Sequence, residues 1–220
     1  MAEVNNTFEF KRCYTVLIST GRKARNLKEL LDILRDVSAD SIFHHTLQYF
    51  MKVHQLSYTN DFAQWAGESL EERALSERLS SIDPFEFSQI EPIRARLIET
   101  VESFLEEFPE PRDVFPGNEF YFNMTLSFVY PVGIRVTGLT EFLQALKSVD
   151  PQCIYYHFYE ARWRLENSID DFSMWLEHSL GEKALAEEVR AIDLFMHTIE
   201  GVRNRIVNLV QERLLRGGNE

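Results

Sequence analysis

The sequence has few of the features that several large classes of protein require. Its 220 residues include two cysteines, Cys13 and Cys153, which are not spaced as a metal-binding pair. We therefore expect no disulfide framework and a reducing, cytoplasmic environment. The most apolar stretch, residues 126–136, is interrupted by proline, glycine and arginine. It falls far short of the roughly 20 apolar residues of a membrane-spanning helix, and we expect no secretory signal at residues 1–10.

Basic residues are also scarce. Lys plus Arg is 23 and Asp plus Glu is 35, so the formal charge is 23 − 35 = −12. This charge disfavours nucleic acid and anionic membranes as partners, since both bind through clustered cations. No nucleophile elbow, phosphate-binding loop or dinucleotide fingerprint occurs. We therefore assign no catalytic residue, no metal and no cofactor, and we expect binding rather than catalysis.

Apolar residues, at 45%, are plentiful, and the sequence matches itself. Between residues 61 and 86, 12 of 26 positions are identical to the residue 110 positions later, where chance gives roughly one or two. At a spacing of 112 the matches include Phe8 with Phe120, Phe10 with Phe122 and His45 with His157. Such a fixed period indicates a structural repeat. Residues 106–119 hold three of the seven prolines and form a linker between unit 8–105 and unit 120–215.

Each copy begins with alternating apolar residues, as in Phe120-Tyr-Phe-Asn-Met-Thr-Leu, which predicts a half-buried strand. The two strands are expected to pair with each other or with a second chain. The period then becomes helical, as in the apolar stripe of residues 27–37. We expect a mainly α fold with minor β, in which each unit has one strand and about five helices. The two units would pack around a pseudo-two-fold axis as one globular body.

Several polar residues are expected to begin helices. Ser38 and Asp150-Pro151 are typical caps. Capping boxes are predicted at Ser69–Glu72, Ser179–Glu182 and Ser88–Glu91.

A histidine and an aspartate recur in both copies, as His45 with Asp61 and His157 with Asp171. The simpler interpretation is a pair of buried polar contacts, repeated because the fold is repeated. An alternative is a metal site formed by both pairs with Glu160 nearby. Each aspartate also opens an Asp-Phe-x-x-Trp motif, which we interpret as core packing rather than an aromatic ligand floor.

One basic cluster stands out in this acidic chain. It contains Arg22, Lys23, Arg25 and Asn26, between the first strand and the first helix. Its cations and backbone N–H groups are suited to a phosphate or carboxylate, although a solvated loop is the simpler explanation, because short charge clusters are common on protein surfaces.

The runs Gly21-Arg-Lys-Ala-Arg-Asn, Ser41-Ile-Phe-His-His-Thr and Asn60-Asp-Phe-Ala-Gln-Trp resemble an uncharacterised prokaryotic family, domain of unknown function 5752. The likeness covers nearly the whole chain and implies no known activity.

The sequence thus favours a non-enzymatic, cytoplasmic binding module that forms a homodimer, with an unknown protein or small molecule as a further partner. One alternative is a binder of, or enzyme for, a phosphorylated metabolite such as a sugar phosphate, using residues 21–26. The other is the metal site described above.

Overall fold

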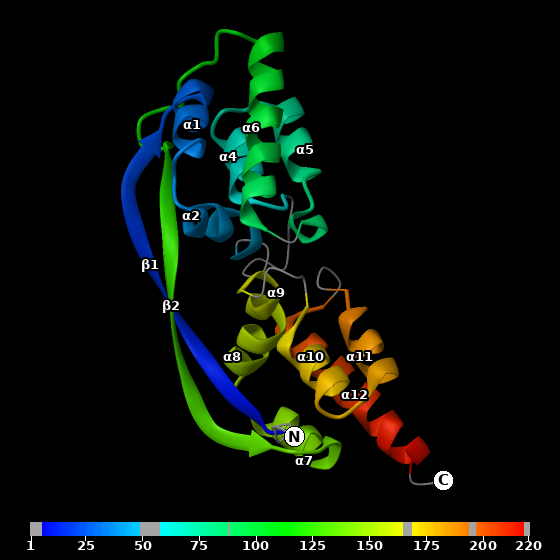
Figure 1. Ribbon diagram of the computed structural model, residues 1–220. Helices are drawn as coiled ribbons and strands as arrows, with labels where there is room; N and C mark the ends of the chain where they lie inside the picture. Colours follow the sequence, from blue (N-terminus) through cyan, green and yellow to red (C-terminus); the bar gives the residue numbers. More distant parts are fainter. Residues whose placement is uncertain (1–5, 49–57, 88, 165–168, 194–196, 218–220) are drawn as a thin grey trace. The chain divides into compact units, whose positions relative to one another are not determined.

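The computed structural model describes residues 6–48, 58–87, 89–164, 169–193 and 197–217. Within these residues the chain forms two long strands. Strand β1 (Phe8–Ala24) and strand β2 (Phe120–Val136) each contain 17 residues. They pair with each other as a two-stranded antiparallel sheet, which is one of the two arrangements expected from the sequence (Figure 1). A glycine with positive φ, Gly21 in β1 and Gly133 in β2, lies within each strand.

The sequence predicts a mainly α fold in which each of two tandem units has one strand and about five helices. This prediction is wrong. The described part of the chain is 58% helical and 18% strand, a mixed α/β composition without a clear five-helix tandem repeat. The strands extend beyond the alternating apolar segments, because the β-branched residues Thr15, Val16, Ile18 and Thr20 also favour extended backbone.

The chain forms two compact units whose boundaries fall inside both strands. Unit 1 comprises residues 1–14 and 127–220, and unit 2 comprises residues 15–126. The beginning of β1 therefore belongs with the helices that follow β2, and the beginning of β2 belongs with the helices that follow β1. The repeat in the sequence predicts instead that each strand belongs as a whole with the helices that follow it.

The helices of unit 2 begin with α1 (Leu27–Leu34), α2 (Ala39–Phe43) and the π-helix η1 (His44–Gln48). They continue with α4 (Asp61–Glu68), α5 (Arg73–Ser80), the 3₁₀ turn η2 (Pro84–Glu86) and α6 (Ile90–Glu107). Helix α6 contacts α1, α2 and α5, while α4 contacts α5 and η1.

The helices of unit 1 are α7 (Leu139–Ser148), α8 (Pro151–Ile154), the π-helix η3 (Tyr155–Glu160) and α9 (Ala161–Arg164). After them come α10 (Asp171–His178), α11 (Lys183–Arg190) and α12 (Ile199–Gly217). Their contacts correspond to those of unit 2: α12 contacts α7, α8 and α11, while α10 contacts α11 and η3. Among the described residues, no helix has the length and hydropathy required to span a bilayer.

The helix starts confirm some of the predicted caps. Ser38 accepts a hydrogen bond from the backbone N–H of Ser41, and Asp150 accepts one from Gln152 ahead of Pro151. The capping boxes at Ser69 and Ser179 are wrong, because these serines follow the last residues of α4 and α10. Ser88 lies outside the described residues.

Candidate functional site

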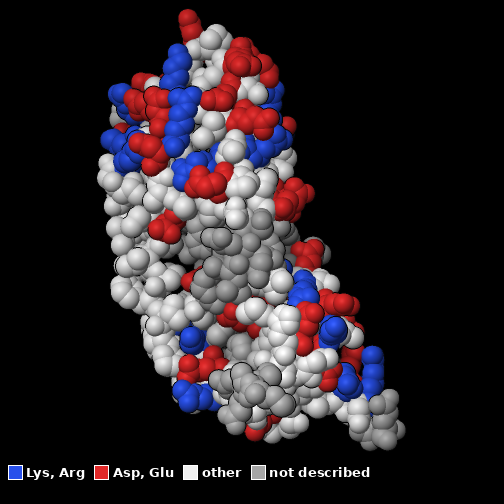
Figure 2. All heavy atoms as spheres, in the orientation of Figure 1, with Lys and Arg blue, Asp and Glu red and all other residues white. Residues whose placement is uncertain are grey.

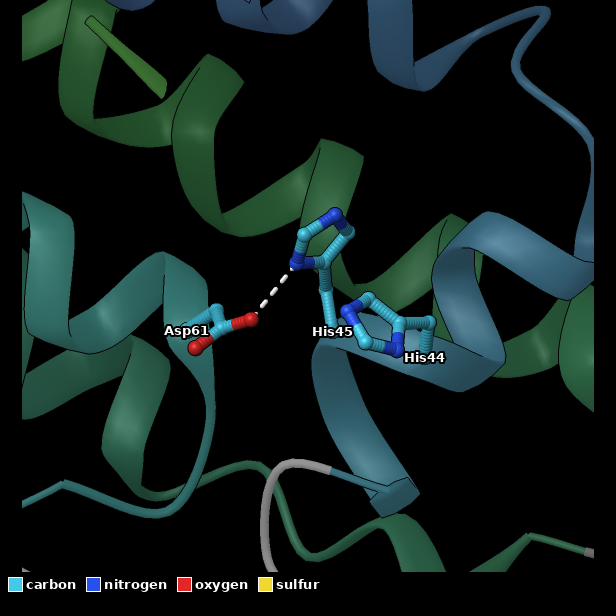
Figure 3. Close-up of side chains that lie close together, drawn as sticks. All are labelled: His44, His45 and Asp61. Carbon is cyan, nitrogen blue, oxygen red and sulfur yellow. Dashed lines mark hydrogen bonds and ion pairs between the residues drawn. The ribbon is translucent and has the colours of Figure 1, made fainter. Parts of the chain in front are cut away.

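The histidine–aspartate pair predicted in the first copy forms within unit 2. His45 lies on η1 and is 3% exposed, and its Nδ1 is 2.6 Å from Oδ2 of Asp61, the first residue of α4 (Figure 3). Its Nε2 is 2.9 Å from the backbone N of Asn123 on β2. The ring thus joins a helix to the strand, and Phe62 and Phe120 pack beside it.

This arrangement determines where the imidazole carries its proton. A backbone N–H can only donate, so Nε2 of His45 must present a lone pair to Asn123. In a neutral ring the proton is then on Nδ1, which donates it to Asp61. Both ring nitrogens are therefore engaged in hydrogen bonds that hold the strand and the helix together.

The same chemistry makes a metal ion at this position unfavourable. One ring nitrogen each of His44 and His45 and a carboxylate oxygen of Asp61 lie within 4.8 Å of one another. However, Nδ1 of His45 has no lone pair to offer while Nε2 accepts from Asn123, and 2.6 Å is a hydrogen-bond separation. An ion bound at about 2.0–2.2 Å from both atoms would require them to move apart. His44 Nδ1 lies 3.1 Å from Gln48 Oε1.

The second pair forms in the same way within unit 1. Nδ1 of His157 is 2.7 Å from Oδ2 of Asp171, and its Nε2 accepts from the backbone N–H of Lys11 at 2.8 Å. Lys11 lies in the initial part of β1, as Asn123 does in β2. Each pair therefore lies within its own unit, and each has the contacts of a structural cross-link.

The Asp-Phe-x-x-Trp motifs contribute to the core. Phe62 stacks on Phe120 with ring centroids 4.9 Å apart, and Phe172 lies 5.5 Å from Phe8. The indole N–H groups donate to backbone carbonyls, Trp65 to Asn118 and Trp175 to Asn6. Trp65 and Trp175 are each 6% exposed.

Each cation of the basic cluster already has a carboxylate partner. Arg22 pairs with Asp36, Lys23 with Glu119 at 3.1 Å, and Arg25 with Glu29 at 2.6 Å. Hydrogen bonds from its own backbone N–H and from Lys23 lower the pKa of Glu119, and the hydrogen bond from the Arg25 side chain lowers the pKa of Glu29. Asn26 caps α1 by accepting from the N–H of Glu29. Gly21 to Ala24 are the last residues of β1, where the sequence analysis had placed a loop. An anion at these residues would have to compete with carboxylates that are already in place.

The two cysteines are poorly suited to nucleophilic chemistry. Both are buried, and neither is in a disulfide. The Cys13 thiol donates to Oε2 of Glu160 at 3.5 Å, and Ser127 donates to the same oxygen at 3.4 Å. Burial, together with this carboxylate, raises the pKa of Cys13 far above its usual range. A buried thiol held in its protonated form is a weak nucleophile.

Large apolar side chains are exposed on the strands. In unit 1, Tyr14, Phe128, Val129 and Tyr130 are between 36% and 54% exposed. In unit 2, Val16, Leu17 and Leu126 are between 43% and 58% exposed. The rings of Tyr14 and Tyr130 stack at 5.7 Å, and the Arg12 guanidinium lies 4.4 Å from the Tyr14 ring centroid. We call Tyr14, Phe128 and Tyr130 the aromatic strand surface, because alternate residues of a strand share one face of the sheet.

Comparison with known proteins places the chain in a family. The model of the DUF5752 family, described as a family of unknown function, matches residues 5–211. The chain belongs to the DUF5752 family. The solved structure described as "The structure of OrfY from Thermoproteus tenax" is 33% identical over 94% of each chain, with a TM-score of 0.76. No curated protein matches the chain.

In this DUF5752 protein, the structure brings His45 to Asp61 and His157 to Asp171, as the polar-pair interpretation expected. Sequence reasoning missed the strand partners Lys11 and Asn123, because both contribute only backbone N–H groups. It also missed that the aromatic strand surface is solvent-exposed. The neutral composition of residues 120–134 in an otherwise charged chain was a usable signal.

Proposed function

We propose that this DUF5752 protein is a non-enzymatic, cytoplasmic binding module that acts as a homodimer through the aromatic strand surface. The observation that carries the proposal is the exposure of Phe128 (54%) and Tyr14 (51%) on strands that pair with each other. Exposed clusters of large apolar side chains mark interaction sites more often than single ones do, and aromatic residues are enriched in interface cores.

The charge distribution favours a second copy as the occupant. The chain carries −12 overall, so two copies repel each other unless they meet through uncharged surface. Residues 13–21 and 120–134 contain no Asp, Glu, Lys or Arg. Figure 2 is largely white over the strands between their ends, while blue and red atoms gather over the helices. A basic partner would be expected to seek the acidic helices instead.

Strand edges support the same proposal. The described sheet has two strands, so β1 and β2 each pair along one edge only. An edge strand offers unpaired N–H and C=O groups to another strand, and a two-fold dimer places identical edges together. The proposed cytoplasmic localisation rests on the low cysteine content, two residues in 220.

The two alternatives have weaker support. An anion site at Arg22, Lys23, Arg25 and Asn26 has to displace carboxylates that already pair with the three cations. A metal site at His45 and Asp61 has to break the hydrogen bond from Asn123.

Sedimentation velocity across a range of protein concentrations tests the proposal. We expect a dimer whose dissociation constant rises at least tenfold in Phe128→Ser and Tyr130→Ser. Phe115→Ser is the matched control, because Phe115 is also a large exposed side chain (76%) but lies outside the strands. A strict monomer at every concentration, or equal weakening by Phe115→Ser, would overturn the proposal.

A further inference from the structure

We propose that unit 2 contains a binding site for a small, neutral, hydroxyl-rich molecule in a hollow between α4 and α5. This inference is independent of the dimer proposed above. The hollow measures about 450 Å³ and is lined by Tyr58, Gly67, Arg73, Ser76, Glu77 and Ser80. Its volume is within the range of about 300–1,000 Å³ that small-molecule sites occupy.

The corresponding helices of unit 1 explain why the hollow exists. Helices α10 and α11 pack together as α4 and α5 do. The residue 110 positions after Gly67 is Glu177, and the residue 110 positions after Ser80 is Arg190. In unit 1 these two long side chains form an ion pair across the helices. Unit 2 has a hydrogen atom and a hydroxymethyl group in their place, so no long side chain from either position crosses between α4 and α5.

The base of the hollow is closely fitted around Gly67. A Cβ atom added there would lie 2.8 Å from the Tyr58 hydroxyl oxygen and 2.9 Å from Oγ of Ser76. The Tyr58 hydroxyl thus takes the place that a side chain at position 67 would fill. The neighbouring Thr59 donates to the carbonyl of Ser80 at 2.8 Å, which fixes this segment against the end of α5.

The lining groups indicate the chemistry of the ligand. Ser76 Oγ uses its proton to donate to the carbonyl of Ala63 at 2.8 Å, so toward the hollow it can only accept. At the mouth, Arg73 can only donate and Glu77 can only accept, and the two pair at 3.2 Å. Hydroxyl groups both donate and accept, so a polyol satisfies all three. An anion would face Glu77 and a cation would face Arg73, so either charge is disfavoured.

Calorimetric titration of the full chain with glycerol, myo-inositol and glucose tests the proposal, with inorganic phosphate and acetate as charged probes. The heat of binding has to be measured rather than a shift in melting temperature, because polyols also raise melting temperatures through exclusion from the protein surface. We expect at least one neutral probe to bind, and Ser80→Arg to weaken its binding at least tenfold by filling the hollow.

Two further variants separate a lost site from a lost fold. Ser76→Ala, which introduces the residue that unit 1 carries as Ala186, should preserve the melting temperature and weaken binding about fivefold. Ser148→Arg, at an exposed position of α7 in unit 1, is the matched control and should bind as the unmodified chain does. The proposal is overturned if no neutral probe binds, if only phosphate or acetate binds, or if Ser80→Arg and Ser76→Ala both leave the affinity unchanged.

Discussion

Nδ1 of His45 lies 2.6 Å from Oδ2 of Asp61, while the opposite ring nitrogen accepts the backbone N–H of Asn123. His157 makes the same two contacts, with Asp171 and Lys11. Each imidazole therefore links the beginning of one strand to the helices encoded after the other strand. In each unit a buried side chain with two directional contacts fixes how the strand lies on its helices.

Removal of this link should reduce stability strongly. His45→Ala leaves the N–H of Asn123 without its acceptor and opens a cavity beside Phe62 and Phe120. We expect a loss of about 2–4 kcal/mol in the free energy of unfolding. Urea denaturation measures it, with His178→Ala at an exposed position as the control, for which a change below about 0.5 kcal/mol is expected. Equal effects of the two substitutions would contradict the structural role.

The proton on Nδ1 also leads to a prediction about metal ions. Zinc titrated against a chromophoric chelator should bind equally to the unmodified chain and to His45→Ala, because Nδ1 offers no lone pair while Asn123 donates to Nε2. Long-range ¹H–¹⁵N NMR spectra should report the proton on Nδ1. Stoichiometric zinc binding that disappears in both His44→Ala and His45→Ala would show that Nδ1 of His45 loses its proton and can bind the ion.

The sequence correctly predicted those helices and strands that depend on residues close to one another in the chain. Alternation in residues 120–126 predicts the buried beginning of β2, and the Asp150-Pro151 pair predicts the start of α8. The capping boxes predicted at Ser69 and Ser179 are wrong because a Ser-x-x-Glu pattern also fits a helix end followed by a turn. The exchange of strand beginnings between the units could not be predicted, since it depends on which helices the phenylalanines of each strand contact.

The candidate site shows the same division between local and tertiary information. The repeat predicted that His45 and Asp61 belong together, because both recur at a matching spacing. The basic cluster was overrated, because Lys23 and its partner Glu119 are separated by 96 residues in sequence. The hollow beside Gly67 becomes visible only when the two helix pairs are compared in space, although Gly67 and Ser80 already differ from their counterparts in the sequence.

If the basic cluster is structural, reversing its charges should lower the melting temperature. The triple variant Arg22→Glu, Lys23→Glu, Arg25→Glu places carboxylates beside Asp36, Glu119 and Glu29. We expect the deficit in melting temperature to shrink as salt is added, because these groups are exposed and ions screen them. Scanning fluorimetry in low and high salt, with and without phosphate, measures both effects. An unchanged melting temperature together with lost phosphate stabilisation would favour an anion site.

Asp170 should make the stability of the protein depend on pH. This residue caps α10, is fully buried, and lies 3.7 Å from Arg162. Burial raises the pKa of its carboxyl group.

The sign of the effect follows from the direction of that shift. A raised pKa in the folded state means that folding favours the protonated form of Asp170. Its contribution to the free energy of unfolding is therefore fully present below the pKa of the unfolded chain, which is about 3.9. It is lost as pH rises through the folded pKa. Relative to Asp170→Asn, the unmodified chain should therefore lose stability as pH rises.

Urea denaturation at a series of pH values measures this difference, and the corresponding cap of unit 2 offers the reverse experiment. Asn60 donates to the carbonyl of Leu79 at 3.0 Å and caps α4. Asn60→Asp places a buried carboxyl group against that carbonyl, so this variant should lose stability as pH rises relative to the unmodified chain. Stability curves that run parallel for the unmodified chain and Asp170→Asn would show that ionisation of Asp170 has no energetic cost.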